Sequence, residues 1–259
     1  MQTVLFHETI FGPIHSRRLG SSLGINLMPN DGKVCSFDCL YCEAGYNAQG
    51  QGTTGIPKRE SVKKALNEKL KTLKEDGQNI DVITFSGNGE PTLHPQFKLI
   101  VHDTLMLRDR YFPEAKVCVL SNATMASKPT VAEALKMVDR NILKLDSAIY
   151  STFHALNRPV SKNVNPSSLI YDMKAFEGQC IVHTLFVRGE HEGKKIDNTT
   201  DEEIEALINA YKEINPQEVM VYSIDRQTPE HNLSKVPKEE LEKIGERIKE
   251  AGINVQVNS

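Results

Sequence analysis

The 259-residue sequence lacks the features that mark secreted, membrane-spanning and disordered proteins. Its amino terminus has no basic region followed by an apolar run, and no later apolar run approaches the length that spans a bilayer. Internal repeats, low-complexity tracts and proline-rich linkers are also missing. We therefore expect a soluble, unprocessed, cytoplasmic protein that has no membrane partner.

A strong charge of either sign is absent as well. The net charge is −3, so general attraction to polyphosphate is not expected, and contact with nucleic acid would need a local basic patch. Hydrophobic residues at 39% and charged residues at 25% are ordinary for a globular protein. The length suits one domain over residues 1–259. We expect its core over about 12–226 and a C-terminal helix and strand over 237–257.

Cysteine is scarce, and its spacing does not suggest a disulfide framework. Of five cysteines, three fall within eight residues at Cys35, Cys39 and Cys42, while Cys118 and Cys180 stand alone in apolar surroundings. An odd number with this grouping indicates a reducing compartment, in which thiolates remain available to a metal.

Short aliphatic runs alternate with amphipathic segments from Ser22 onward, which predicts a series of βα units. Val62, Leu66 and Leu70 share one helix face, and Thr200 followed by Glu203 is typical of a capping box at a helix start. The candidate strands cover residues 22–28, 80–85, 116–120, 141–145, 180–187 and 218–224.

Six βα units without a dinucleotide fingerprint after the first strand favour an α/β fold, a partial (β/α)6 barrel with parallel strands. Six strands are fewer than the eight of a closed barrel, so one side should remain open to a large substrate. We interpret the polar segment 189–200 as a long loop, and 238–251 as a final helix that leads to a short apolar run.

The three grouped cysteines have C-x3-C-x2-C spacing directly after the first predicted strand. Three thiolates at this spacing can hold three corners of an iron–sulfur cubane and leave the fourth iron open to a ligand. A zinc site completed by His15 or His7 is the alternative. Structural zinc usually draws on paired C-x2-C units, however, and no second pair exists here.

A glycine-rich segment follows the second predicted strand, with Gly87, Asn88, Gly89, Glu90 and Pro91 in succession. Glycines let the backbone approach a ligand closely, and a glutamate can accept a hydrogen bond from an ammonium group. The same letters also describe an ordinary turn.

Polar residues end the third and fourth predicted strands as well. Ser121 and Asn122 predict either ligand contacts or a cap for the helix that follows. Lys144 lies between two leucines in a strand, so it should point to the opposite side, into the barrel, where Asp146 follows it at the strand end.

Further basic residues lie near the expected mouth of the barrel. Arg17 and Arg18, with His15, could bind phosphate or carboxylate, or form a solvated turn. Arg188 ends the fifth predicted strand and Arg226 follows the sixth, and both predict either substrate contacts or surface ion pairs.

The motif Cys35-x3-Cys39-x-Tyr41-Cys42 resembles the cluster motif of the radical S-adenosylmethionine (SAM) superfamily. This resemblance implies a [4Fe-4S] cluster, S-adenosylmethionine chelated to the open iron, and reductive cleavage to a 5′-deoxyadenosyl radical. It also implies that Tyr41 lies against the adenine, and that the segment from Gly87 to Pro91 holds the methionyl amine.

The segments from Gly12 to Gly20, Gly89 to Thr92, and Asp225-Arg226 further resemble short enzymes related to the wyosine-synthesising tRNA enzymes, but extra cysteines for a second cluster are missing. Three hypotheses follow. The chain modifies RNA, such as tRNA, or another phosphate-bearing substrate; it activates a glycyl-radical enzyme; or it is a non-catalytic electron-transfer or zinc module. The first two imply an electron donor of the flavodoxin or ferredoxin type.

Overall fold

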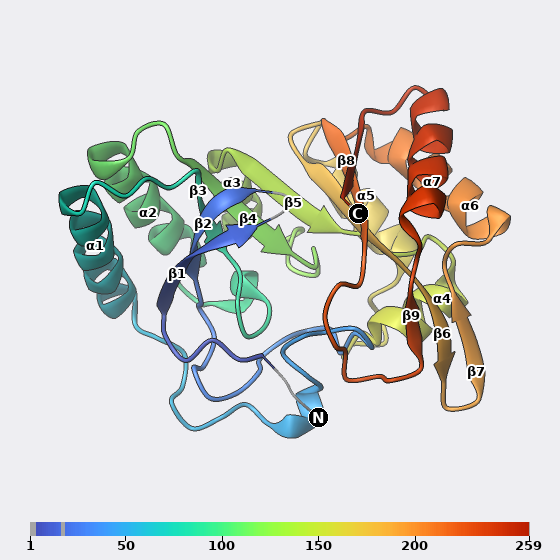
Figure 1. Ribbon diagram of the computed structural model, residues 1–259, viewed down its shortest axis with the longest axis horizontal. Coiled ribbons are helices and arrows are strands. Elements are labelled where there is room, and N and C mark those ends of the chain that lie inside the picture. Colours follow the sequence, from blue (N-terminus) through green and yellow to red (C-terminus); the bar gives the residue numbers. More distant parts are fainter. Residues whose placement is uncertain (1–3, 17–18, 259) are drawn as a thin grey trace.

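A computed structural model of the chain describes residues 4–16 and 19–258. They form a ten-stranded sheet flanked by helices (Figure 1). The strand order is β1-β2-β3-β4-β5-β6-β8-β10, and β7 and β9 both pair with β6. The strands are β1 (Ile10–Ser16), β2 (Gly20–Ile25), β3 (Val82–Phe85), β4 (Lys116–Ser121), β5 (Arg140–Lys144), β6 (Ile181–His191), β7 (Lys194–Asp197), β8 (Glu218–Ser223), β9 (Leu233–Lys235) and β10 (Val255–Asn258).

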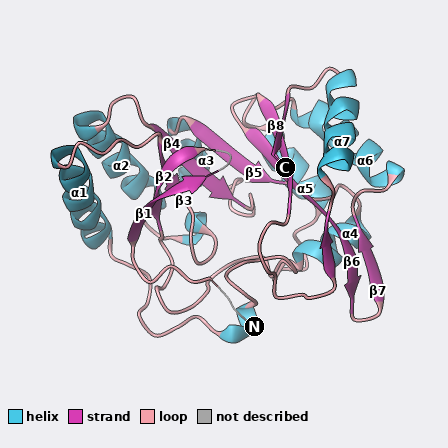
Figure 2. Cartoon of the chain, viewed as in Figure 1, coloured by secondary structure: helices cyan, strands magenta, loops and turns pink. Residues whose placement is uncertain are grey.

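The helices lie between the strands in the chain order expected for βα units. They are α1 (Arg59–Glu75), α2 (Phe97–Tyr111), α3 (Pro129–Met137), α4 (Tyr150–Asn157), α5 (Pro166–Lys174), α6 (Asp201–Ile214) and α7 (Lys238–Glu250), with short 3-10 helices η1 (Asn47–Gln49) and η2 (Pro91–Leu93). The long segment 26–58 between β2 and α1 is irregular apart from η1, and it runs along the lower edge of the molecule in Figure 2. None of the helices in the described ranges has the length and apolar character needed to cross a bilayer.

The sheet is mostly parallel. Strands β2, β3, β4, β5, β6, β8 and β10 run parallel to one another in this order, while β1 is antiparallel to β2, and β7 and β9 are antiparallel to β6. The six predicted strands correspond to β2, β3, β4, β5, β6 and β8. The predicted α/β fold, a partial barrel with parallel strands, is therefore confirmed.

The first predicted strand is too long at its carboxyl end. Strand β2 stops at Ile25, because the Asn26 side-chain oxygen accepts hydrogen bonds from the backbone N–H groups of Met28 (3.2 Å) and Asn88 (3.1 Å). These bonds turn the chain out of the sheet. Met28 is nevertheless buried, which explains why the apolar pattern continues past the strand.

The prediction of a long loop over residues 189–200 is wrong. Strand β6 continues to His191, and a two-residue turn at Glu192 and Gly193, both with positive φ, leads into β7. Such turns suit tight hairpins. This arm of the sheet lacks the apolar alternation from which strands are predicted, since Lys194 and Lys195 are both exposed.

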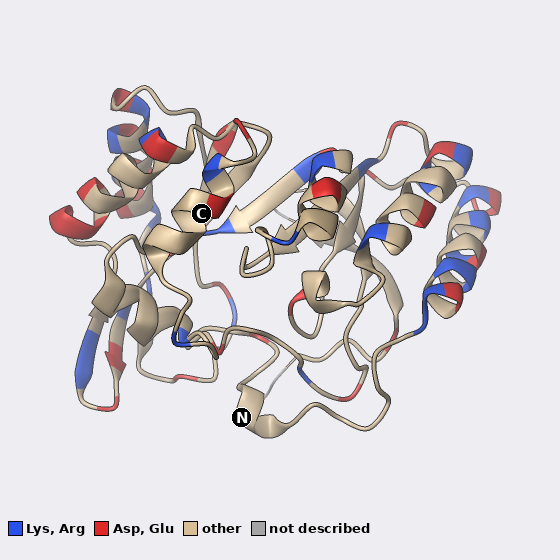
Figure 3. Ribbon diagram, turned by 180° about the vertical axis from the view of Figure 1, so that it is seen from behind, with Lys and Arg blue, Asp and Glu red and all other residues tan. Residues whose placement is uncertain are grey.

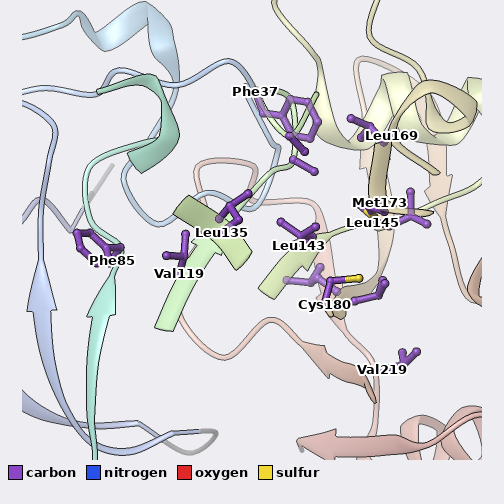
Figure 4. Close-up of a cluster of buried hydrophobic side chains, with 14 of the residues drawn as sticks. Phe37, Phe85, Val119, Leu135, Leu143, Leu145, Leu169, Met173, Cys180 and Val219 are labelled. Atoms are coloured by element: carbon purple, nitrogen blue, oxygen red, sulfur yellow. The ribbon is translucent and has the colours of Figure 1, made fainter. Parts of the chain in front are cut away.

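Alternating side chains of the strands form two apolar clusters. The larger one packs between the sheet and the helices, and Figure 4 shows Phe85, Val119, Leu143 and Val219 from four strands within it. The smaller cluster takes one residue from each of five neighbouring strands, namely Val82, Cys118, Ile142, Ile181 and Met220. Because side chains alternate along a strand, the smaller cluster lies on the face opposite the helices, inside the partial barrel.

The cap of α6 follows the sequence prediction in part. The Thr200 side chain accepts a hydrogen bond from the Glu203 backbone N–H at 3.3 Å. The Glu203 side chain does not close the capping box, because its carboxylate accepts a hydrogen bond from Ser147 at 2.7 Å. Glu203 therefore fastens α6 to the segment that follows β5.

Candidate active site at the carboxyl ends of the strands

A cavity of about 330 Å³ opens at the carboxyl ends of the parallel strands. Its wall comes from the loop after β2 and from the ends of β3, β4, β5, β6 and β8. This is the end at which parallel α/β folds place their sites. The following predicted site residues line it: Cys35, Cys39, Tyr41, Cys42, Gly87, Gly89, Glu90, Ser121, Asn122 and Lys144.

The three grouped cysteines are all free thiols that face this cavity. Burial raises the pKa of Cys39 to about 11 and raises the pKa of Cys35 further. A buried thiolate therefore needs a compensating cation, which the irons of a cluster supply. The chemistry of this set of sulfur ligands fits the predicted cluster.

The protein also supplies positive charge to the sulfurs. Lys33 is 3% exposed, and its ammonium donates to the Gly45 carbonyl at 2.7 Å and lies 3.6 Å from Asp38. Burial would lower the pKa of Lys33, but the thiolates of Cys42, Cys35 and Cys39 outweigh it, so that the pKa is raised. A charged lysine beneath the loop suits ligands that carry negative charge.

Two side-chain amides contact the sulfurs directly. Asn122 Nδ2 donates to Cys35 Sγ at 3.6 Å, and Asn157 Nδ2 donates to Cys39 Sγ at 3.5 Å. Amide donors to cysteine sulfur are common around iron–sulfur clusters. His7 and His15, which would complete a zinc site, are exposed and lie outside the cavity wall. Within the described ranges, no three His, Cys, Asp or Glu side chains are grouped so that they could hold a single metal ion.

The glycine segment holds the cysteine loop in place. Val34 and Gly89 form an isolated parallel bridge, with Val34 N–H donating to the Asn88 carbonyl (3.1 Å) and Glu90 N–H donating to the Val34 carbonyl (3.0 Å). A Cβ on Gly89 would lie 1.8 Å from the Val34 carbonyl oxygen, and its φ is +145°. Glycine is required at position 89 because the backbone of the cysteine loop packs directly against it. From the sequence alone, this reason could not be told apart from close approach of a ligand.

Glu90 joins the glycine segment to the end of β4. It is 2% exposed, and its carboxylate accepts hydrogen bonds from Thr92 (backbone N–H and hydroxyl), the Ser121 hydroxyl and the Asn122 backbone N–H. Burial raises the pKa of Glu90, and these four hydrogen bonds oppose the rise. The carboxylate therefore has protein partners in addition to its place in the cavity wall.

Lys144 points into the barrel, as the alternation predicts. Its ammonium donates to the Tyr41 hydroxyl at 2.6 Å, lies 3.5 Å from the Asp146 carboxylate and sits 4.8 Å from the centre of the Tyr41 ring. Burial would lower the pKa of Lys144, but the charge of Asp146 outweighs it and raises that pKa. The Lys144 side chain is 19% exposed, so its ammonium borders the cavity but is only partly accessible to solvent.

Four other predicted site residues do not line the cavity. Asn88 binds the Phe6 backbone, Pro91 is buried at the start of η2, and Arg188 pairs with Glu240. Asp146 is fully buried behind Tyr41, where it accepts from the Tyr41 hydroxyl, Asn157 Nδ2 (2.6 Å) and Leu185 N–H (2.9 Å). Arg17 and Arg18 lie outside the described residues.

The alternative role of Ser121 and Asn122 as a helix cap is wrong. Helix α3 begins at Pro129 after Lys128, and the two side chains bind the N–H groups of Ala123 (3.0 Å) and Thr124 (3.1 Å) instead. They stabilise the turn that leads away from β4.

His183 and Tyr222 are cavity residues that the sequence analysis missed. Their rings stack with centroids 4.1 Å apart and an interplanar angle of 4°. His183 pairs with Lys144 in the register of β5 and β6. The alternation argument used for Lys144 could have found both, because each is a polar residue at an inward position of a predicted strand.

Arg226 also lines the cavity, and it bridges to Glu43 of the cysteine loop at 2.6 Å. Asp225 lines the cavity next to it and pairs with Lys235 at 3.1 Å. Both partners of each pair are more than 40% exposed, so these are surface ion pairs at the rim. The predicted surface ion pair is present at Arg226, and the predicted contact with substrate stays a prediction.

Comparison with known proteins finds relatives that are similar in sequence over most of this chain. The chain is 29% identical over 256 residues to a Brachyspira hyodysenteriae protein named GTPase Obg, which covers 97% of this chain and 35% of that protein. It is 30% identical over 240 residues to a UPF0026 protein of Methanocaldococcus jannaschii, covering 89% of this chain and 68% of that protein. The chain thus spans about a third of the first relative and two thirds of the second.

Two solved structures share the fold at low identity. Streptococcus suis SuiB bound to S-adenosylmethionine superposes with a TM-score of 0.64 at 16% identity, over 91% of this chain and 50% of SuiB. TYW1 with a lysine-pyruvate adduct gives 0.59 at 12% identity, over 88% of this chain and 73% of TYW1. The sequence profile of the radical SAM superfamily matches residues 30–169, which is more than half of the chain. The chain therefore belongs to the radical SAM superfamily, and this membership implies a [4Fe-4S] cluster and S-adenosylmethionine as its cofactors.

Proposed function

We propose that this chain is a radical SAM enzyme that holds one [4Fe-4S] cluster on Cys35, Cys39 and Cys42. The observation that carries the proposal is that three free thiols, two of them bonded to side-chain amides, share one cavity with a glycine-rich strand end. When bound, such a cluster supplies the electron that cleaves S-adenosylmethionine to methionine and a 5′-deoxyadenosyl radical, which takes hydrogen from the substrate.

The chain's own residues bind and orient the cofactor in this proposal. Gly87 and Gly89 allow close approach of the backbone, and Glu90 offers a carboxylate toward the methionyl ammonium. Lys144 has three N–H donors; one donates to the Tyr41 hydroxyl, and the Asp146 carboxylate lies 3.5 Å from the ammonium. The ammonium can therefore also donate to a carboxylate in the cavity. The Tyr41 ring is held by its hydroxyl between Lys144 and Asp146, which sets its face for the adenine.

The proposal extends to a phosphate-bearing substrate such as RNA. Its support is the resemblance to wyosine-synthesising enzymes together with Arg226 at the cavity rim. Figure 3 shows basic and acidic residues interspersed, mainly on the helices. Arg226 and the other cations close to the cavity would thus have to supply the contact with phosphate.

We further propose that the whole chain acts as one domain in the cytoplasm. All five cysteines are free, which suits a reducing compartment. The superfamily needs a reductant, and a flavodoxin or ferredoxin is the donor that we propose for this chain.

Anaerobic reconstitution tests the proposal. We expect close to four irons and four sulfides per chain, and 5′-deoxyadenosine when S-adenosylmethionine and dithionite are added. Cys35→Ala, Cys39→Ala and Cys42→Ala should each abolish both readouts, while the buried Cys118→Ala and Cys180→Ala serve as matched controls and should keep the iron. Tightly bound zinc without iron would overturn the proposal.

A further inference from the structure

The amide of Asn157 reaches a cysteine sulfur from a position 118 residues along the chain. Asn157 is the last residue of α4 and is fully buried. The end of this helix also holds the cysteine loop through its backbone, since Asp38 N–H donates to the Asn157 carbonyl (3.0 Å) and Leu40 N–H donates to the Leu156 carbonyl (3.1 Å). The carboxyl end of α4 therefore fixes the position of the Cys39 sulfur relative to the Asn157 amide.

The orientation of the Asn157 amide follows from its neighbours. Its Nδ2 donates to Asp146 Oδ2 at 2.6 Å and to the Tyr41 hydroxyl at 3.4 Å, while its Oδ1 is buried without a partner among the described residues. The reversed amide would place that oxygen against the Asp146 carboxylate. One N–H therefore points toward Asp146, and the other points toward Cys39 Sγ and the Tyr41 hydroxyl, which lie at similar distances.

Asn122 makes the equivalent contact at a second sulfur. Its Oδ1 accepts from the backbone N–H and hydroxyl of Thr124 (3.1 and 2.8 Å), which directs Nδ2 to Ser36 Oγ (2.9 Å) and Cys35 Sγ (3.6 Å). Asn122 directly follows β4 and Asn157 ends α4, so the two donors approach the cysteine loop from separate parts of the fold.

We propose that Asn122 and Asn157 are positioning residues that raise the reduction potential of the cluster, an inference that rests on the proposed function. An N–H donor withdraws negative charge from a ligating sulfur. The reduced cluster carries one more negative charge than the oxidised one, so the same hydrogen bond stabilises it more. The effect is strong in a site with few solvent contacts, because the local dielectric is low.

Variants at the two positions test the inference by potentiometry followed by electron paramagnetic resonance. Asn157→Leu and Asn122→Leu should each shift the midpoint potential to more negative values, and the double variant should show about the sum, because the donors act on different sulfurs. Asp146 still has the Leu185 N–H, Tyr41 and Lys144 when Asn157 is replaced, so the site keeps its other hydrogen bonds.

Asn198 provides a matched control. It is also fully buried and also binds the segment around Asp146, but its Nδ2 donates to the carbonyls of Asp146 and Leu185, both at 2.7 Å. Asn198→Leu removes a buried amide of the same kind without removing a sulfur contact. Its midpoint potential should equal that of the wild-type protein, and a shift as large as that of Asn157→Leu would overturn the inference.

A measurement on the wild-type protein covers the case in which a variant loses its cluster. Protein labelled with ¹⁵N in the asparagine side chains should show a hyperfine coupling from ¹⁵N to the reduced cluster in pulsed resonance spectra. Absence of this coupling, or unchanged potentials in both iron-loaded variants, overturns the inference and leaves the proposed function standing. Absence of any cluster from the wild-type protein overturns the proposed function itself.

Discussion

Lys144→Met removes a positive charge that faces both the cavity and Asp146. The substitution keeps the apolar stem of the side chain and deletes its ammonium. Asp146 is fully buried, and Lys144 is the cation that lies 3.5 Å from it. We expect the variant to lose stability, because the carboxylate remains in a dry position without its counter-charge.

The magnitude follows from the geometry of the pair. Breaking a buried ion pair by removing one partner costs about 3–5 kcal/mol, whereas exposed pairs contribute at most about 1 kcal/mol. Lys144 is 19% exposed, and Asp146 keeps hydrogen bonds from Asn157, Leu185 and Tyr41. Because of both features, we expect a loss of unfolding free energy at the lower end of the range for buried pairs, about 3 kcal/mol. For a domain of this size, this corresponds to a fall in Tm of roughly 6–12 °C.

Urea unfolding of the cofactor-free protein measures the loss, and Lys235→Met is the matched control. Lys235 lies 3.1 Å from Asp225, closer than Lys144 lies to Asp146, but the side chains of Lys235 and Asp225 are both nearly half exposed. The control should lose less than about 1 kcal/mol. Equal losses in the two variants would refute the reasoning, because they would show that burial does not set the strength of the Lys144 pair.

Calorimetry with S-adenosylmethionine tests whether the Lys144 ammonium also binds the cofactor. A charge-assisted hydrogen bond contributes about 1.5–3 kcal/mol, so the affinity of Lys144→Met should fall roughly tenfold to a hundredfold if this group meets the cofactor carboxylate. Unchanged affinity with the expected loss of stability would leave Lys144 as the partner of Asp146 and remove it from the cofactor site.

Three further outcomes are expected. Glu90→Gln should destabilise the protein by about 1–3 kcal/mol in urea unfolding and also weaken cofactor binding, because an amide NH₂ cannot accept the hydrogen bonds that the buried carboxylate accepts; unchanged stability would contradict the network. Gly89→Ala should lower the iron content while far-UV circular dichroism is retained, because its Cβ would strike Val34. Asp103→Asn should lower the free energy of unfolding by about 2 kcal/mol at pH 7, because the hydrogen bonds from Arg59 outweigh burial and lower the pKa of Asp103. This stabilisation is present above the pKa of about 4 in the unfolded chain and is lost as the pH falls through the lower pKa of the folded protein. The stabilities of wild type and variant should therefore converge in acid.

Parallel strands are the part of the fold that the sequence predicts best. Strands β3, β4 and β5 are buried along nearly their whole length, so apolar runs identify them within two residues. The strand β1 and the hairpin of β6 and β7 escape prediction because one face of each is solvated and carries polar residues. Their pairing depends on neighbours in the sheet, which a local pattern does not contain.

The candidate site divides in the same way. The cysteine spacing and the inward position of Lys144 are local properties, and the structure brings those residues to one cavity. Asp146 follows the same strand end, yet the Tyr41 ring covers it. The residue that covers Asp146 and donates a hydrogen bond to it lies 105 residues earlier in the chain, so no sequence pattern at the strand end indicates this contact.

The residues of the glycine segment show why a motif does not by itself give the role of each member. Gly89 admits the backbone of Val34, Asn88 holds Phe6, and Glu90 binds the turn after β4. Each of these contacts is with protein, although the segment borders the cavity. A cofactor that binds here therefore meets a wall whose shape is already set by hydrogen bonds among distant elements. Substitutions in the segment are accordingly expected to alter the wall before they alter any single cofactor contact, so cluster content, stability and cofactor affinity have to be measured on the same variant.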